Sequence, residues 1–191
     1  KVDVMGVKVE GAPGKDISSS SGRNSISGNN TLGFDHLVSK ITEPDAWNNL
    51  NFDFNFNHKT DTLGSSFSLV TDYTKLTENI LSENINEFHD LNETLVLPSN
   101  NYRSDDKGNS TIFAGRADFV KIIDTTSSFE SGLKAAYVKT FNDYLFERDS
   151  ANDGSYFKDP NLSSKFQYTE VTYAGYFNYI KSVKKLSMQL G

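Results

Sequence analysis

Aromatic and amide side chains alternate without a break in the segment NLNFDFNFNH, residues 49–58. The apolar parity holds Leu50, Phe52, Phe54 and Phe56, and the polar parity holds Asn51, Asp53, Asn55 and Asn57. Because successive side chains of a β-strand point to opposite sides, this pattern predicts a strand with one apolar and one polar face. Such a strand occurs in a soluble sheet, where the apolar face lies in a core, and in a transmembrane barrel, where it meets lipid.

The same alternation returns at intervals along the rest of the chain. Further strands are predicted at SFSLVTDYTKL (66–76), TIFAGRADFVKII (111–123), SFESGLKAAYVKTFNDYLFE (128–147), KFQYTEVTYAGYFNYI (165–180) and LSMQLG (186–191). Short polar turns near 60–65, 123–127 and 181–185 join the strands into hairpins 49–76, 110–147 and 164–191. Longer polar stretches separate the hairpins, so six antiparallel strands in sequence order should have their tight turns at one end and their long loops at the other.

This asymmetry favours a membrane barrel over a soluble sandwich. Outer-membrane barrels have short periplasmic turns, long external loops and aromatic girdles at the lipid interfaces. Aromatic residues beside the second long loop, Tyr144, Phe146, Phe166 and Tyr168, are expected to belong to such a girdle. The predicted fold class is all-β, an antiparallel up-and-down transmembrane β-barrel, with about six to seven strands of a larger barrel in residues 49–191. Six or seven strands are too few to close, so the sheet should be open, with Asn49–His58 and Leu186–Gly191 near unpaired edges or bonded to absent or partner strands.

Residues 1–48 form a separate, loop-rich segment in this interpretation. Val2, Val4, Val7 and Val9 suggest a first strand interrupted by Gly6. The Gly, Ser and Asn residues of 10–33 show little periodicity and predict a mobile loop. The stretch FDHLVSKITEPDAW, residues 34–47, is compatible with a short turn of helix or a loop, which Pro44 limits.

The alternation assigns side chains to two faces. The residues predicted to face lipid are Phe52, Phe54, Phe56, Phe67, Leu69, Phe119, Leu133, Tyr137, Tyr173 and Phe177. The polar residues predicted to line the lumen are Asn51, Asp53, Asn55, Arg116, Asp118, Glu130 and Lys134. Mixed charges at mid-strand suit a wet lumen and would be costly against hydrocarbon.

Composition narrows the function classes. Hydrophobic residues make up only 36% of the chain while aromatic residues reach 13%, which fits a sheet with one wet face. A net charge of −6 without a basic cluster disfavours nucleic acid, and the lack of cysteine excludes disulfides and thiolate sites. The histidines His36, His58 and His89 lie far apart in the sequence without ligand spacing, so each is interpreted as a surface or lumen residue. We therefore expect no catalytic residue, no metal, no cofactor and no enzymatic activity.

The segments FAGRADFVKIIDTTSSFESGLKAAYVKTFNDYLFE (113–147) and DPNLSSKFQYTEVTYAGYFNYIKSVKKLSMQLG (159–191) together resemble a known family. They are similar to the barrel of TonB-dependent receptor-like outer-membrane proteins of the Bacteroidota type. The similarity covers about residues 45–191, with departures at KTFNDY (139–144) and SMQLG (187–191). It implies a cell outer membrane location, a barrel of about twenty-two strands with a plug domain upstream, and TonB-driven uptake of a large nutrient ligand. Outer-membrane lipid, TonB and a surface lipoprotein are the partners it implies.

Two functions remain open at this point. The first is part of a receptor barrel that binds and imports a ligand; the second is a binding, adhesion or structural barrel module without active transport. A plug domain in the full-length gene would favour the first, and a soluble β-sandwich enzyme is a distant third.

Overall fold

The computed structural model describes residues 3–25, 33–184 and 186–191, and in these ranges the chain is built from strands. The nine strands are β1 (Asp3–Ser25), β2 (His36–Lys59), β3 (Ser66–His89), β4 (Leu95–Leu97), β5 (Asn101–Asp124), β6 (Ser127–Asp149), β7 (Phe157–Lys158), β8 (Ser164–Val183) and β9 (Leu186–Leu190). No helix in the described residues is long and apolar enough to cross a membrane.

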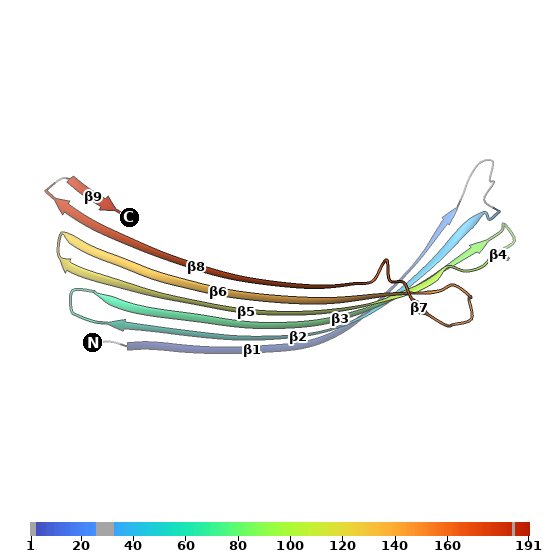
Figure 1. The fold of residues 1–191 in the computed structure, drawn as a ribbon, viewed down its shortest axis with the longest axis horizontal. Helices are drawn as coiled ribbons and strands as arrows, with labels where there is room; N and C mark the ends of the chain where they lie inside the picture. The colour runs from blue at the N-terminus through green and yellow to red at the C-terminus, as the bar shows by residue number, and fades with distance from the viewer. Residues whose placement is uncertain (1–2, 26–32, 185) are drawn as a thin grey trace.

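All nine strands belong to one antiparallel sheet with the order β1-β2-β3-β5-β6-β8-β9, while β4 pairs with β3 and β7 pairs with β6. Figure 1 shows the long strands running side by side, with the tight turns at the left end and the loops that carry β4 and β7 at the right. The turns between β2 and β3, β5 and β6, and β8 and β9 fall where they were predicted. The six consecutive strands and the asymmetry of their connections are therefore confirmed.

The sheet is curved and open, because β1 and β9 occupy its two ends and do not pair with each other among the described residues. Leu186–Gly191 lies at an edge, as predicted. The prediction for Asn49–His58 is wrong, because this segment of β2 is paired on both sides. Leu50, for example, stands opposite Gly11 of β1 and Lys75 of β3. An additional strand, β1, takes the edge.

The largest differences from the predicted elements lie in the first 48 residues. Residues 10–25 form most of β1 rather than a loop, and they pair with β2 as far as Ser25, opposite His36. Residues 26–32 of the predicted loop, and Val2 of the predicted first strand, lie outside the described residues. Residues 36–47 continue β2, so neither the helical turn nor the loop expected there is present. Backbone pairing along a neighbouring strand needs no side-chain periodicity, and this is why a Ser- and Gly-rich segment can be a strand.

The strands are much longer than the alternation predicted. β2, β3 and β5 have 24 residues each, about 80 Å of extended chain, whereas about 9–11 residues of tilted strand suffice to cross a bilayer. No hydrophobic side chain of the described residues is buried, so these residues form a single layer with two open faces. The second sheet that a soluble sandwich needs is not present in the described ranges.

Candidate functional site

The register of the sheet separates the side chains into two chemically different faces. Residues directly opposite each other on neighbouring strands point to the same side of the sheet. One such row crosses β2, β3, β5 and β6 and consists of Phe56, Leu69, Ala117 and Leu133. We call the side that carries these residues the aromatic face and the opposite side the polar face. All residues predicted to face lipid fall on the aromatic face, and all residues predicted to line the lumen fall on the polar face.

The aromatic face carries a band of apolar side chains next to the tight turns. One ladder across five strands consists of Phe52, Tyr73, Phe113, Tyr137 and Val171. A second ladder, nearer the turns, consists of His58, Phe67, Phe119, Ser131 and Phe177. Between the two ladders, β3, β5 and β6 carry smaller and aliphatic residues such as Leu69, Ala117 and Leu133, while Phe54, Phe56 and Tyr173 add aromatic rings on β2 and β8. An apolar band with aromatic side chains near its borders is typical of the lipid-facing surface of a membrane barrel.

The apolar band ends on all five strands at one ladder, which consists of Leu50, Lys75, Thr111, Lys139 and Thr169. Towards the turns, Lys121 of β5 marks the opposite border and forms an ion pair of 2.9 Å with Asp61. From Thr111 to Lys121 the strand advances about 33 Å, which is about 25 Å in height for a tilt near 40°. This height equals that of the apolar band on outer-membrane barrels.

Beyond this ladder the same face carries ion pairs as well as apolar residues such as Leu81 and Phe141. Arg103 and Glu147 approach to 2.6 Å across β5 and β6, and Lys165 and Asp143 to 2.6 Å across β6 and β8. Lys107 pairs with Asp105 within β5. We call the part of the strands beyond the ladder the outer half and the part next to the tight turns the inner half.

The polar face of the inner half holds a hydrogen-bonded network. Arg116 lies 2.6 Å from a carboxylate oxygen of Asp118, and the Tyr176 hydroxyl donates to the other oxygen at 2.8 Å. Lys134 stands opposite Arg116 on the neighbouring strand, and within the described residues it has no ion-pair partner. The Thr74 hydroxyl donates to Asn51 at 2.9 Å. These groups prefer contact with water to contact with hydrocarbon.

Large side chains on the polar face lie across glycines of the neighbouring strand. A Cβ atom at Gly132 would stand 2.3 Å from the ring of Tyr176, and one at Gly14 would stand 2.1 Å from the ring of Trp47. Both rings therefore require glycine opposite them. In each case the side chain lies flat against the sheet, which lets Tyr176 reach Asp118.

The four aromatic residues expected in a girdle beside the second long loop belong elsewhere. Tyr144, Phe146, Phe166 and Tyr168 have the same parity as Glu130 and Lys134 and so lie on the polar face. The prediction considered only that these aromatic residues lie near strand ends. It did not consider which face of the sheet each side chain points to, and this is why it is wrong.

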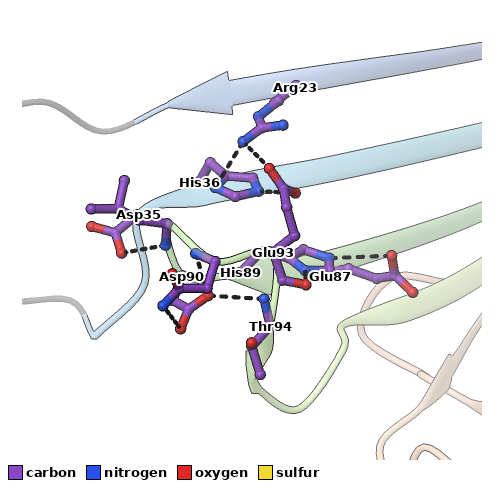
Figure 2. Close-up of polar contacts among 10 residues, drawn as sticks. Arg23, Asp35, His36, Glu87, His89, Asp90, Glu93 and Thr94 are labelled. Carbon is purple, nitrogen blue, oxygen red and sulfur yellow. Dashed lines mark hydrogen bonds and ion pairs between the residues drawn. The ribbon is translucent and has the colours of Figure 1, made fainter.

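A compact polar cluster occupies the loop end of β1, β2 and β3, and Figure 2 shows how its members face one another. His36, at the start of β2, and His89, at the end of β3, are register partners with rings stacked 5.4 Å apart. Nε2 of His36 lies 3.0 Å from Oε2 of Glu93, and Arg23 of β1 donates to the other oxygen at 2.7 Å. The same guanidinium lies 3.3 Å from Nδ1 of His36. His36 is only 2% exposed.

The turn between β3 and β4 aims Glu93 at this cluster. Glu93 has a φ of +62°, a left-handed conformation that is uncommon for a residue with a Cβ atom. Asp90 fixes the turn by accepting hydrogen bonds from the backbone N–H groups of Asn92 and Thr94, both at 2.8 Å. The Arg23 and His36 hydrogen bonds lower the pKa of Glu93, and the Thr94 and Asn92 N–H groups lower that of Asp90. Both carboxylates are thus held in their charged form.

The interpretation of the histidines as surface or lumen residues is wrong for His36, which is buried. His36 and His89 are far apart in the chain, but the β2–β3 register brings them together. His58 lies at the other end of β2, where it pairs with Asp3. The sequence contains the information needed to predict this pair. When the two strands are extended in the register that places Phe56 opposite Leu69, His36 falls opposite His89. The predicted strands stopped at residues 49 and 76 and therefore did not include the two histidines.

Comparison with known proteins gives the family. The model of the outer membrane protein beta-barrel family matches residues 58–191, which is more than half of the chain. Among curated proteins no relative matches. The match begins at the end of β2 and includes every later strand of the open sheet. The chain therefore belongs to the outer membrane protein beta-barrel family and is a protein of the outer membrane.

Proposed function

We propose that the aromatic face of the inner half meets outer-membrane lipid and that the polar face lines a water-filled lumen. Leu133 and Tyr173 are 71% and 79% exposed in this single layer, so the aromatic face needs an apolar environment. Arg116 and Asp118, in contrast, would be expensive in hydrocarbon. The long loops of outer-membrane barrels lie outside the cell, which puts the outer half and the His36 cluster on the external side.

We further propose that the sheet is one wall of a wide receptor barrel that takes up a ligand with the help of TonB. The observation that supports this best is the open sheet: among the described residues, six long strands and the short β9 leave the outer edges of β1 and β9 available for further strands. Barrels of many strands enclose a lumen wide enough for a channel or a plug, whereas those of about eight strands are filled by side chains. The resemblance to TonB-dependent receptor-like barrels supports the same function.

In this proposal the outer half binds a nutrient ligand. β2 and β3 continue beyond the apolar band by about 14 residues and β5 and β6 by about ten, which is about 30–45 Å of extended chain, and they carry charged side chains on both faces. Such a surface gives a large polar ligand many places for hydrogen bonds and ion pairs. TonB and a surface lipoprotein would act through other parts of the full-length protein.

The alternative is a binding or adhesion module that uses the same outer surface without transport. The length of the strands favours it, because a wall that extends far beyond the membrane can also attach a cell to a surface.

Deletion strains distinguish the two functions. We expect a strain without this gene to grow poorly on one large nutrient, and we expect additional loss of TonB to leave that defect unchanged, since both proteins serve one route. The proposal also requires the purified full-length protein to bind the periplasmic domain of TonB. A strain that grows normally on a broad nutrient panel but loses surface attachment would establish the adhesion function instead.

A further inference from the structure

We infer that His36, His89 and Glu93 form a binding site for a zinc-like divalent metal ion at the outer end of the sheet. Each residue offers one ligand atom, and the three atoms lie within 4.8 Å of one another. A tetrahedral zinc ion with bonds of about 2.0–2.1 Å requires ligand atoms about 3.3 Å apart. The His36–Glu93 pair already stands at 3.0 Å, so rotation of side chains suffices to complete the site.

The donor set selects the type of metal. Two imidazole nitrogens and one carboxylate oxygen suit zinc and its neighbours in the first transition row. Calcium and magnesium prefer six or more oxygen ligands and would not be held by this set. Three protein ligands leave a fourth position for water or a donor from outside, as in many zinc sites.

Neighbouring residues orient the ligands through hydrogen bonds, as the groups around the ligands do in zinc sites. Arg23 holds Oε1 of Glu93 at 2.7 Å, which leaves Oε2 turned towards His36. The Glu87 carboxylate lies 3.4 Å from Nε2 of His89, so it can accept the outer N–H of that ring when Nδ1 holds the metal. Figure 2 shows the Glu93 carboxylate beside the His36 ring and the Glu87 carboxylate beside the His89 ring.

The backbone gives a second, independent indication. The left-handed φ of Glu93 costs free energy, and such conformations persist where the surroundings impose them, frequently at binding sites. Glu93 occupies the turn that Asp90 fixes. Glycine or asparagine would be less strained in this position but would offer no carboxylate.

Metal binding requires a local change at each histidine. Nδ1 of His89 lies 3.1 Å from the backbone carbonyl oxygen of Glu93 in the metal-free cluster and gives up this contact when it holds the metal. In the metal-free cluster Nδ1 of His36 faces the donor Arg23, so Nε2 carries the proton and donates it to Glu93. With a metal on Nε2, the ring takes the other tautomer with its proton on Nδ1. The 3.3 Å contact to Arg23 is then lost, while the shorter Arg23–Glu93 ion pair remains. The ion would link β2, β3 and the β3–β4 turn through its three ligands. β1 would be linked to them through the ion pair between Arg23 and Glu93.

The test is a zinc titration of the full-length protein in detergent micelles after removal of metals, with a fluorescent zinc chelator as competitor. We expect one zinc ion per protein, at least tenfold weaker binding for His36→Ala and His89→Ala, and no binding of calcium. His58→Ala is the matched control, because His58 lies on the same strand, also beside a carboxylate, but at the other end of the sheet. It should bind zinc like the unmodified protein.

Because His36 is buried, a variant at this position can fail to fold, so Glu93→Gln provides the second measurement. Glu93 is 57% exposed and the amide preserves its shape, so the barrel should fold normally and bind zinc at least tenfold more weakly. X-ray absorption of the zinc-loaded protein should show nitrogen and oxygen ligands only, including two imidazoles. Unchanged zinc affinity in folded His89→Ala and Glu93→Gln, or an absorption spectrum without imidazole, would overturn the inference. The result is independent of the transport proposal, since neither uptake nor TonB enters the measurement.

Discussion

The inner and outer halves of the sheet share the same strands, the same register and the same two faces, yet their aromatic faces differ completely. On β2, β3, β5, β6 and β8 of the inner half this face presents ladders such as Phe52, Tyr73 and Phe113, with no Asp, Glu, Lys or Arg between the two borders. In the outer half it presents ion pairs such as Arg103–Glu147. Backbone hydrogen bonds continue through both halves unchanged. The backbone pairing is therefore the same in both halves. Only the side chains of this face indicate where contact with lipid is expected to end and contact with water to begin.

The polar faces of the two halves differ much less. Asp118 and Tyr176 form a network in the inner half, and Ser110 and Thr140 are hydrogen bonded at 3.1 Å farther along the same strands. A lumen and the space beyond the membrane are both aqueous, so one composition suits both. Comparison of the halves thus identifies the aromatic face as the informative one.

An arginine placed on each surface should give the largest contrast. Phe54→Arg puts a charge in the apolar band and should lower the free energy of unfolding by about 2–4 kcal/mol if it lies near the bilayer midplane. Asn55→Arg, one residue away on the polar face, should cost little because its side chain enters water. Denaturant unfolding in lipid vesicles measures both.

A third variant extends this test to the outer half. Leu81 lies on the aromatic face opposite Asp105, so Leu81→Arg should be tolerated although it also replaces an apolar residue on that face. Equal tolerance of Phe54→Arg and Asn55→Arg would mean that the aromatic side is not in lipid. A loss confined to Asn55→Arg would reverse the two faces.

Glycine substitutions should give the next largest contrast, now between the two faces of the inner half. Gly132→Ala places a methyl group 2.3 Å from the Tyr176 ring. The ring must move and lose its hydrogen bond to Asp118, at a cost of about 1–3 kcal/mol. Gly115→Ala on the aromatic face meets only Thr71 at 3.8 Å and should be neutral or slightly stabilising. The same unfolding measurement serves, and equal costs would show that the Tyr176 ring does not depend on Gly132.

Much of this arrangement is predictable from the sequence in the inner half. The alternation from Leu50 to Phe56 predicts a strand with two chemically different faces, and it gave the correct strands, turns and division of side chains between the two faces. The tight turns were found because short polar segments interrupt the alternation, such as TDTLGS at 60–65.

The outer half was missed for a physical reason. Where water covers both faces, a strand needs no alternation, so the polar segments 10–25 and 101–110 looked like loops although they pair along their whole length. The cluster of His36, His89 and Glu93 was missed with them. The register links the two histidines once the strands are long enough, but the φ of Glu93 that turns its carboxylate inward has no sequence signal.

The two ends of the sheet should also differ in their response to acid, with a local effect and no change in global unfolding. Hydrogen bonds lower the pKa of Asp90 and Glu93 in the folded protein. Their stabilising contribution is therefore complete above the unfolded values of about 4 and is lost as the pH falls below them. The β3–β4 turn should remain closed from pH 7 to 5 and open at lower pH.

A spin label on the single cysteine of Leu91→Cys reports this opening, since the chain has no other cysteine. The control is a label at Leu63 in the β2–β3 turn. There the Ser65 and Lys121 hydrogen bonds hold the pKa of Asp61 far below its usual range. That turn should stay ordered at a pH where the label at Leu91 has become mobile. An increase in mobility of the Leu91 label between pH 7 and 5 would contradict the assignment.

The last experiment tests the boundary between the two halves, and the expected result is that tryptophan fluorescence does not change. Trp47 is the only tryptophan of the chain. It lies on the polar face of the outer half, with its ring over Gly14, and so should be out of reach of lipid. Brominated lipid chains quench tryptophan on contact, and we expect them to leave the fluorescence of Trp47 unchanged in reconstituted vesicles.

The positive control is Phe113→Trp in a Trp47→Phe background, because position 113 lies in the aromatic ladder at the outer border of the apolar band. This tryptophan should be strongly quenched. Quenching of Trp47 as strong as that at position 113 would place the membrane across the outer half and shift the proposed border towards the His36 cluster.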